Sequence, residues 1–451
     1  MNASFCMVKP AQERPNEVMA LSDVDQATAL THVLLVHFYA PNSHLLQENA
    51  VQTLKDSLSK ALVLFYPAAG RLQWTNTSRL ELNCNSTGVP FVDAKSDATI
   101  GDFGDFLPDA KVKQLIPRVD YSQPIQDCPL LLVQVTRFKC GGLCLGWGIS
   151  HVLGDGQSAT HFLSEWARIA RGEPPENPPV LDRRLLIPKE PLAGPLFDHI
   201  GLKPLPLLLG QSDYAEERNK ETTVAMLRLT KEQVEKLKKK ANEHSTSHNM
   251  GRPFSKYEAV AGHLWRCACK ARRHKSEQTT CLRIAVDFRN RVEPNLPKGY
   301  FGNAIASAVA IAASGDLTSK PLAYTSKIIR EAVKKMTNEY VKSYLESLRK
   351  EPDLSKFRSS HEVGSTWGIF KGNPNIEITS WITIPLQGAD FGWGTEIYCG
   401  PANIGYDGKS YILDGRDEDG SLVIALRLQV AHMDALKRIF YEDILSWRSR
   451  C

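Results

Sequence analysis

One histidine in this chain stands where an imidazole can act as a base. His151 follows an apolar run that ends at Ile149, and it precedes the tight segment Gly154-Asp155-Gly156. An imidazole with a pKa near neutrality takes a proton from a hydroxyl or amine that attacks a carbonyl, and then returns it to the leaving group. The two glycines carry no side chains, so we expect them to leave room for a substrate. The segment permits general base catalysis, and the alternative is a structural histidine, which is the commoner role of a single histidine at a strand end.

The nucleophiles that the chain lacks argue against a covalent intermediate. The sequence has no Gly-x-Ser-x-Gly elbow, and none of its cysteines has the setting of a nucleophile. We therefore expect direct transfer of an acyl group within a ternary complex. Asp155 has two possible roles at this point. It orients the imidazole, or it ties the turn to an arginine elsewhere, for which Arg289 and Arg291 are the candidates.

Regular elements are expected on both sides of His151. Residues 130–135 and 143–149 are predicted to form the strands of a hairpin, joined by the turn Cys140-Gly141-Gly142. Apolar residues then recur at helical spacing from Ala159 to Ala170. His151 is thus predicted at a strand-to-helix junction, where rigid elements hold polar side chains within reach of a ligand.

The chain divides into two halves of similar size. Residues 172–210 hold nine prolines, which disfavour a regular helix or central strand and predict an extended connection. Beyond it, capping boxes that begin at Thr230 and Ser255 predict two helices, and apolar residues from Met433 to Ile444 predict a third. The mixture of elements predicts an α/β fold.

Composition is that of an ordinary soluble protein. The 451 residues are 42% hydrophobic and 23% charged, with a formal net charge of +5. No apolar run is long enough to span a bilayer, and no secretory signal is recognised. The cysteines lack the spacing of a zinc site, so we expect reduced thiols and no metal. Basic clusters at 236–240 and 270–275 have no aromatic residues between them, so no nucleic-acid partner is expected.

Several motifs, in their order along the chain, resemble those of the plant BAHD acyltransferases, CoA-dependent enzymes that acylate alcohols and amines. The family carries His-x-x-x-Asp-Gly near the middle and Asp-Phe-Gly-Trp-Gly near the C-terminus, which match His151–Gly156 and Asp390–Gly394. Further matches span the chain, at Val8–Ala11, Tyr66–Leu72, Asp287–Arg291 and Gly299–Asn303.

The resemblance implies the architecture of the molecule. Two chloramphenicol-acetyltransferase-like domains, each a mixed sheet flanked by helices, are expected at residues 1–180 and 216–451. The crossover loop is expected at 181–215, with some strands of the second domain exchanged into the first. A channel at the interface admits the acyl-CoA co-substrate on one side and the acceptor on the other. By the same resemblance we expect a cytoplasmic monomer with no permanently bound cofactor and no membrane partner.

The resemblance also assigns roles to the motif residues. His151 corresponds to the general base. Asp155 corresponds to an aspartate that points away from the substrate and pairs with an arginine, here Arg289. The turn that holds Asp390, Gly392 and Trp393 is expected to be structural, although its aspartate is sometimes given as a second catalytic residue.

Within the family, the hydroxycinnamoyl transferases are most similar to this chain. They share Thr379-Ser380-Trp381 before Pro385 and the later Gly400-Pro401-Ala402. The resemblance implies that Thr379 and Trp381 line the reaction centre. The start of the helix at Ser255 and Lys256 offers N–H groups, a hydroxyl and a positive charge, which suit a CoA phosphate.

The prediction of the acceptor depends on one position at which this chain differs from the shikimate and quinate transferases. Shikimate and quinate transferases usually have an arginine where this chain has Thr383, and that arginine binds the acceptor carboxylate. A threonine cannot replace this charge-assisted contact. We therefore predict an amine acceptor such as spermidine, with Thr383 among the residues that bind it. The alternative is an alcohol acceptor: shikimate, quinate or another specialised-metabolite hydroxyl.

Two other classes share the scaffold. The condensation domains of peptide synthetases have a second histidine where this chain has Ser150. A non-catalytic binding protein would have lost the base, whereas His151 is present. Both are disfavoured.

Overall fold

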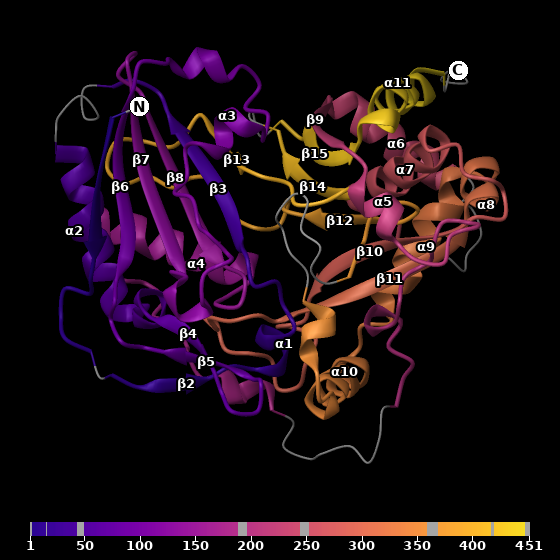
Figure 1. Cartoon of the computed structure of the whole chain (residues 1–451). Helices are drawn as coiled ribbons and strands as arrows, with labels where there is room; N and C mark the ends of the chain where they lie inside the picture. Colours follow the sequence, from indigo (N-terminus) through magenta and orange to yellow (C-terminus); the bar gives the residue numbers. More distant parts are fainter. Residues whose placement is uncertain are drawn as a thin grey trace.

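The computed structural model describes residues 2–14, 16–42, 49–187, 196–243, 252–358, 369–415 and 419–446. Two six-stranded sheets lie side by side, the first built mainly from the N-terminal half of the chain and the second from the C-terminal half (Figure 1). The α/β fold with two sheet-containing domains predicted from the sequence is therefore present.

The first sheet has the order β1-β6-β7-β8-β3-β13. Its strands are β1 (Asn2–Val8), β6 (Val89–Ser96), β7 (Leu131–Phe138), β8 (Leu143–Ser150), β3 (His32–Tyr39) and β13 (Tyr398–Pro401). The last strand comes from the C-terminal half and pairs antiparallel with β3. The strand exchange implied by the family resemblance is therefore present. A boundary near residue 180 divides the chain into two halves, but the first sheet contains strands from both halves.

The hairpin that leads to His151 forms where the sequence predicts it. β7 and β8 pair antiparallel from Leu131–Ile149 to Arg137–Leu143, and Gly141 occupies the turn with a φ of 84°. Every residue of β8 is buried. A Cβ atom at Gly146 would lie 1.9 Å from the carbonyl oxygen of Leu115, so this strand needs glycine where a neighbouring segment crosses it. The strand end that carries His151 is consequently rigid.

Two helices cover one face of the first sheet, α2 (Asn49–Leu64) and α4 (Gly156–Ala170), and they pack against each other. Phe162 and Trp166 of α4 lie in one core with Trp147 of β8. The helical spacing seen in the sequence therefore marks the face of α4 that is buried.

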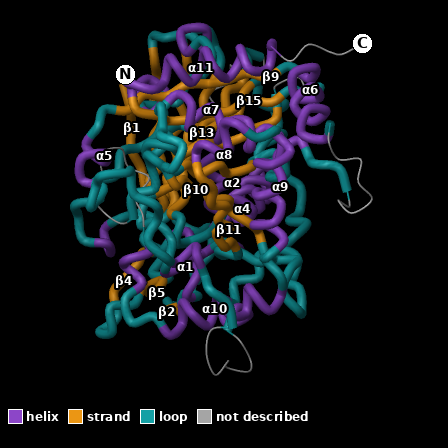
Figure 2. Tube along the Cα trace, turned by 90° about the vertical axis from the view of Figure 1, so that its right-hand side faces the viewer, coloured by secondary structure: helices purple, strands orange, loops and turns teal. Residues whose placement is uncertain are grey.

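The second sheet has the order β11-β10-β12-β14-β15-β9. Its strands are β11 (Ile305–Ala313), β10 (Thr279–Asp287), β12 (Ile376–Ser380), β14 (Lys409–Asp414), β15 (Leu422–Gln429) and β9 (Thr222–Leu229). Helices lie around these strands in Figure 2, namely α6 (Lys231–Asn242), α7 (Lys256–Ala271), α8 (Ser314–Ser319), α9 (Leu322–Lys334) and α11 (Val430–Ser446). The capping boxes predicted at Thr230 and Ser255 are present.

Side chains alternate between the two faces of the second sheet, as the pleat of a strand requires. Ile376 and Ile378 of β12, with Ile412 of β14, join the core formed with the helices of the second half. Tyr411 and Leu413 instead join the core of the first half. One face of this sheet is therefore turned towards its own helices and the other towards the first sheet.

The proline-rich connection contains no α-helix or strand in its described part. It has the short 3-10 turns Arg183–Leu186 and Ile200–Leu202 and one bridge between Val180 and Tyr300. These residues lack the regular helix and strand that the prolines disfavour, and 188–195 lie outside the described residues.

The remaining elements are short or peripheral. They are the small sheet β2 (Val18–Ala20), β5 (Leu80–Asn83) and β4 (Arg71–Trp74), the helices α1 (Asp23–Gln26), α3 (Ala110–Lys113), α5 (Ala215–Asn219) and α10 (Asn338–Lys350), and the 3-10 turns Tyr66–Ala69, Ile100–Phe103, Ile125–Asp127 and Leu354–Phe357. Within the described residues, no helix has the length and apolarity to cross a membrane.

Candidate active site

His151 lies at the junction between β8 and α4, as predicted. Its backbone N–H donates to the carbonyl of Thr31 (3.1 Å), and the N–H of Leu153 donates back to Ser150 (2.9 Å). Asp155 caps the first turn of α4 by accepting from the N–H of Ser158 (3.1 Å). The imidazole is therefore carried by backbone that is fixed on both sides.

Asn303 of the second half determines which ring nitrogen of His151 carries the proton. Its amide nitrogen donates to a carboxylate oxygen of Asp25 and to the His151 carbonyl, each at 2.8 Å. Both partners only accept, so the amide oxygen must face Nδ1 of His151, at 3.2 Å. This assigns the hydrogen to Nδ1 and places the basic lone pair on Nε2.

The surroundings keep the imidazole neutral. Burial lowers the pKa of His151 below its ordinary value of 6.5, and the positive charge of Lys409 lowers it further. The backbone of His151 itself, the Asp155 carboxylate and the Asn303 amide act in the opposite direction without reversing the decrease. A neutral imidazole is the form that accepts a proton, so the site holds the base ready at neutral pH.

Asp155 does not orient the imidazole, because its carboxylate binds elsewhere. Arg289 donates to both oxygens, at 2.8 and 2.9 Å, and the N–H of Ala304 donates to one of them at 2.9 Å. Burial raises the pKa of Asp155, but Arg289 and the N–H donors outweigh it, so the pKa lies below its usual range. Arg291 instead donates to the carbonyls of residues 333 and 336. Of the two candidate arginines, Arg289 is the partner.

Three successive N–H groups of the second half, at residues 302–304, are held by side chains of the first half. They donate in order to the Ser158 hydroxyl (2.9 Å), to Asp25 (2.8 Å) and to Asp155 (2.9 Å). Asp25 is itself paired with Arg183 at 3.0 Å, and both side chains are almost fully buried. We call this set of contacts the 302–304 clamp. It joins the two halves beside His151.

The glycines next to His151 do not make room for a substrate, so that expectation is wrong. A Cβ atom at Gly154 would lie 2.7 Å from Cβ of Ser158, and one at Gly156 would lie 2.8 Å from Cδ1 of Ile384. Both positions are small because protein atoms pack against them. The Ile384 contact shows instead that the loop after β12 reaches the histidine turn.

The three residues predicted to bind substrate lie on β12 or in that loop. The Thr379 hydroxyl accepts from Nζ of Lys409 at 2.8 Å. The Trp381 ring is buried against Tyr411, with ring centroids 4.3 Å apart. Thr383 is exposed, one residue before Ile384. The structure therefore brings Ile384 of this loop against Gly156 in the histidine turn, with Thr379 on the strand before the loop.

The Asp390–Gly394 turn lies away from the histidine. The Asp390 side chain accepts from the N–H groups of Gly392 and Gly394 (2.8 Å each), which have φ values of 106° and 93°. Its carbonyl accepts from Arg171, which follows the C-terminus of α4. His151 precedes the N-terminus of that 15-residue helix, roughly 22 Å away along its axis. This geometry gives Asp390 no part in chemistry at His151.

Aromatic and polar contacts fix the same turn to the first half. Phe391 packs edge-on against Trp166 of α4, with centroids 5.0 Å apart. The carbonyl of Trp393 accepts from the side chain of Asn42 (2.8 Å), and its ring packs on Tyr39. These contacts hold the segment that leads into β13, which supports the structural alternative for the turn.

The predicted CoA-binding residues have protein partners of their own. The Ser255 hydroxyl caps α7 by accepting from the N–H of Glu258 (3.2 Å). Lys256 pairs with Asp414 at 3.1 Å, and both side chains are about one-third exposed. A phosphate bound by Lys256 would therefore have to displace Asp414.

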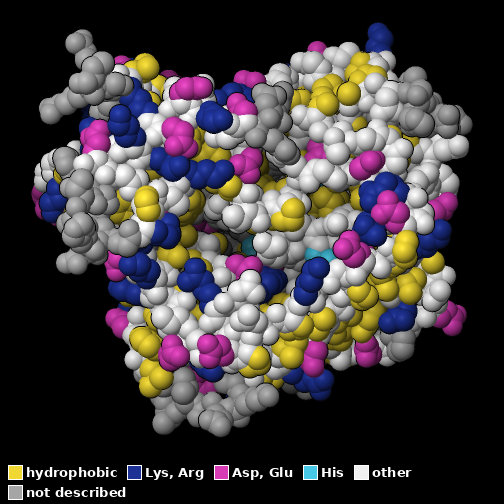
Figure 3. Space-filling model, turned by 180° about the vertical axis from the view of Figure 1, so that it is seen from behind, with side chains coloured by type: hydrophobic (Ala, Val, Ile, Leu, Met, Phe, Trp, Pro, Cys, Tyr) yellow, Lys and Arg dark blue, Asp and Glu magenta, His cyan; other side chains and the backbone are white. Residues whose placement is uncertain are grey.

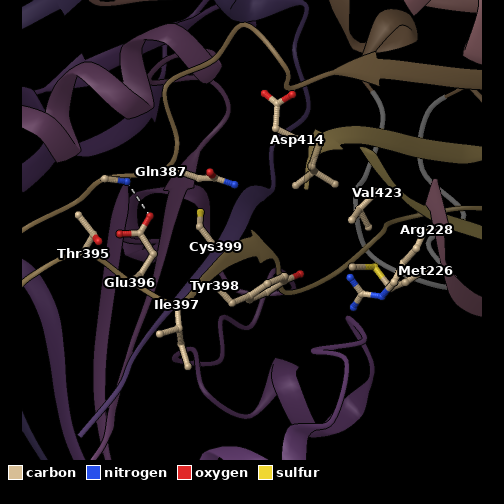
Figure 4. A pocket seen from close by; sticks show the side chains of 12 residues that line it. Met226, Arg228, Gln387, Thr395, Glu396, Ile397, Tyr398, Cys399, Asp414 and Val423 are labelled. Atoms are coloured by element: carbon tan, nitrogen blue, oxygen red, sulfur yellow. Dashed lines mark hydrogen bonds between the residues drawn. The ribbon is translucent and has the colours of Figure 1, made fainter. Parts of the chain in front are cut away.

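A pocket of about 160 Å³ opens beside Asp414, between β13 of the first sheet and β9, β14 and β15 of the second (Figure 4). Its lining includes Arg228, Cys399 and Asp414 and excludes His151. Seen from behind, the surface of the molecule is hollowed near its middle, and histidine side chains are visible there (Figure 3).

Two groups of side chains within the described residues have the composition of a metal site. In the first, His37, Glu396 and Cys399 lie close together, but both Glu396 oxygens accept from backbone N–H groups. In the second, formed by His263, Cys267 and Asp443, the carboxylate is paired with Lys270. Neither group lies at His151.

Sequence reasoning missed the residues that complete the site from a distance. In the sequence, Asn303 stands out only as the last residue of a segment that matches the family. The local pattern around Asp25 indicates no more than a capping box with Ser22. Lys409 lies in none of the segments that match the family. The one signal that pointed to Asn303 was its place in the Gly299–Asn303 match.

Comparisons with known proteins agree with the fold and with the family resemblance. The model of the Transferase family matches residues 3–443. The chain is 47% identical to hydroxycinnamoyl-CoA:piscidic acid hydroxycinnamoyltransferase of Actaea racemosa, over 98% of this chain and 99% of that protein. It is 42% identical to shikimate O-hydroxycinnamoyltransferase of Nicotiana tabacum, over 97% and 98%. It is 37% identical to a hydroxycinnamoyl-CoA:5-hydroxyanthranilate N-hydroxycinnamoyltransferase of Avena sativa, over 96% and 97%.

Solved structures share the same architecture. Vinorine synthase matches with a TM-score of 0.73 at 22% identity, over 96% of this chain and 95% of that one. TRI101 of F. sporotrichioides, complexed with coenzyme A and T-2, matches with a TM-score of 0.76 at 18% identity, over 93% and 97%. At these identities the likeness establishes the fold.

We predict that Asp155→Asn destabilises the fold much more than Asp287→Asn. Asp155 is buried, and its loss of charge leaves Arg289 poorly compensated at a cost of roughly 3 to 5 kcal/mol. Asp287 also contacts Arg289, at 3.3 Å, but its side chain is 37% exposed and its replacement should cost about 1 kcal/mol or less. Urea unfolding measures both. Equal stabilities for the two variants would exclude a structural role for the Asp155–Arg289 pair.

We predict that Asn303→Ala lowers kcat roughly 10- to 100-fold, part of the usual contribution of a general base. The pH midpoint of kcat/KM should also move down, because the Asn303 contact raises the pKa of His151. A loss of stability alone would not move this midpoint. Asn42→Ala is the matched control, since its amide also bridges the two halves but far from His151. An unchanged midpoint in Asn303→Ala would show that the amide does not act on the imidazole.

Proposed function

This chain belongs to the BAHD family of acyltransferases, and on that premise we propose that it acylates a hydroxyl group of a small acceptor with a hydroxycinnamoyl group taken from CoA. Hydroxycinnamoyl-CoA acyltransferase activity is the property that its relatives share by name. The proposal adds the kind of acceptor and the roles of the residues. The observation that carries it is the neutral His151, with its basic lone pair on Nε2.

The reaction follows from this geometry in two proton transfers. Nε2 takes the proton of the acceptor hydroxyl while the oxygen forms a bond to the thioester carbonyl carbon. The tetrahedral intermediate then breaks its C–S bond, and the departing CoA sulfur takes the proton back from the imidazolium. The Thr379 oxygen accepts from Lys409, so its own hydrogen remains to be donated to the oxyanion. No covalent enzyme intermediate is needed.

A hydroxyl acceptor fits the electrostatics better than a polyamine. An aliphatic amine is an ammonium ion at neutral pH and must lose a proton before it attacks, which a base of lowered pKa does poorly. The charge nearest to Thr379 is the cation Lys409 rather than a carboxylate. None of the three relatives described above names a polyamine. The alcohol alternative therefore replaces spermidine as the proposed acceptor.

We expect purified protein to release CoA from p-coumaroyl-CoA in the presence of an alcohol acceptor and not with spermidine. The panel should contain shikimate, quinate, tartrate, piscidic acid and spermidine, with CoA measured by a thiol reagent and the products by mass spectrometry. His151→Ala should reduce turnover by about 10² to 10⁴ while the protein stays folded. A higher kcat/KM for spermidine than for every alcohol would refute hydroxyl acylation, and a His151→Ala variant within a few-fold of wild type would refute the base.

We further expect kcat/KM to rise with pH through a midpoint below 6.5 and then to level off. The active form of His151 is neutral, and burial, together with Lys409, lowers its pKa from 6.5 despite the opposing effects of Asp155 and Asn303. Activity is therefore lost as the pH falls through that lowered value. Rates measured from pH 4.5 to 9 in buffers of constant ionic strength locate the midpoint. A midpoint at 7 or above would contradict the assignment.

A further inference from the structure

A row of charged residues crosses the second sheet on the face turned towards the first half. By strand register, Arg283 of β10 lies beside Glu377 of β12, and Glu377 lies beside Lys409 of β14. Their neighbours Leu282, Ile376 and Ile378 belong to the opposite, helix-covered face. Because side chains alternate along a strand, the charged row and the helices lie on opposite sides of the sheet.

One carboxylate serves three cations in this row. Glu377 contacts Lys409 at 2.6 Å, Lys371 at 3.2 Å and Arg283 at 3.7 Å. Among the described residues, no other carboxylate lies within ion-pair distance of these three cations. With all four groups ionised, the cluster carries two positive charges in excess. We call it the Glu377 cluster.

The cluster is largely buried but not sealed. Its side chains are between 5% and 13% exposed. Buried charge without a counter-ion is costly, so an excess of cations in such a place favours a bound anion. Burial lowers the pKa of Lys371 to about 8, and the neighbouring Arg283 and Lys409 add to that decrease although Glu377 opposes it. An anion bound at the cluster would compensate the buried positive charge and raise the pKa of Lys371.

The row lies next to the reacting groups. Lys409 donates to the Thr379 hydroxyl, and its charge acts on the pKa of His151. Thr379 is two residues further along β12 than Glu377, a step of about 7 Å on the same face. An anionic group held by the cluster would therefore belong to a molecule that also reaches His151.

We propose that the Glu377 cluster binds a carboxylate of the acceptor, so that the substrate is a hydroxy acid whose hydroxyl is presented to His151. Lys371 supplies the direct contact with the carboxylate. Arg283 adds its positive charge while its terminal NH groups donate to the Gly201 carbonyl and the Ser307 hydroxyl, and Lys409 is held by Glu377 and Thr379. The inference rests on the proposed function. It also accounts for Thr383, because cations on strands β10 and β14 and at residue 371 take over the task of the missing arginine.

The test compares an acid with its ester at the same hydroxyl. We expect wild-type protein to acylate shikimate or tartrate from p-coumaroyl-CoA with a kcat/KM at least about tenfold above that of methyl shikimate or dimethyl tartrate, the usual size of one charge-assisted hydrogen bond. Lys371→Met should reduce this ratio to about threefold or less, and Lys371→Arg should retain it. Lys356→Met is the control, since Lys356 is exposed and its one ion pair among the described residues is with Glu351.

The outcomes separate the inference from the proposed function. If acid and ester are acylated equally well by wild type, the hydroxyl acceptor stands and the cluster has no role in binding it. If Lys371→Met raises KM for p-coumaroyl-CoA and keeps the acid-to-ester ratio, the anion is a CoA phosphate and the inference is wrong. If only amines are acylated, the proposed function itself fails. Should Lys371→Met not fold, Lys371→Gln replaces it in the same comparison, and a wild-type acid-to-ester ratio near one refutes the inference without any variant.

Discussion

The site depends on three consecutive backbone N–H groups that cross from one half of the molecule to the other. Residues 302–304 donate to Ser158, Asp25 and Asp155, and none of these acceptors belongs to their own sheet. A buried N–H that loses its acceptor costs about 1 to 3 kcal/mol, so separating the halves here exposes three such costs together. The clamp therefore fixes the distance between His151 and Asn303, and with it the tautomer of the base. The same contacts therefore make the interface rigid and determine which nitrogen of the His151 ring acts as the base.

Charge is distributed unequally along this interface. At the clamp each buried carboxylate has one arginine, Asp25 with Arg183 and Asp155 with Arg289, so that region is close to neutral. At the Glu377 cluster one carboxylate meets three cations. The neutral region contains the base, which has to be unprotonated before the acceptor attacks. The positive region lies where an acceptor would be held. Ion pairs between arginine and aspartate thus stabilise the interface on one side of the site. On the other side, the ion pairs of Glu377 leave an excess of positive charge that favours a bound anion.

What the sequence could predict was local. The hairpin before His151, the helix after it and both capping boxes depend on residues within about fifteen positions of one another, and all were found. The Asp155–Arg289 pair, which joins residues 134 positions apart, was expected only from the family resemblance, because the residues alone left Arg289 and Arg291 open. Asn303 could not be found in this way, since its role depends on Asp25, 278 positions away. The glycines were misread because sequence does not show that Ser158 and Ile384 occupy the space beside them.

The acceptor illustrates why one substituted position is a poor guide to specificity. The absence of an arginine at Thr383 suggested a cationic acceptor, an inference that is sound only if no other cation faces the same space. The pairing of β12 with both β10 and β14 places Arg283 and Lys409 on either side of Glu377, although these residues are separated in the sequence by 94 and 32 positions. Electrostatic potential depends on the distance between charges in space and is indifferent to which strand supplies them. Cations on neighbouring strands can therefore create the potential that one arginine would supply, and such a site has to be sought across the register of the sheet.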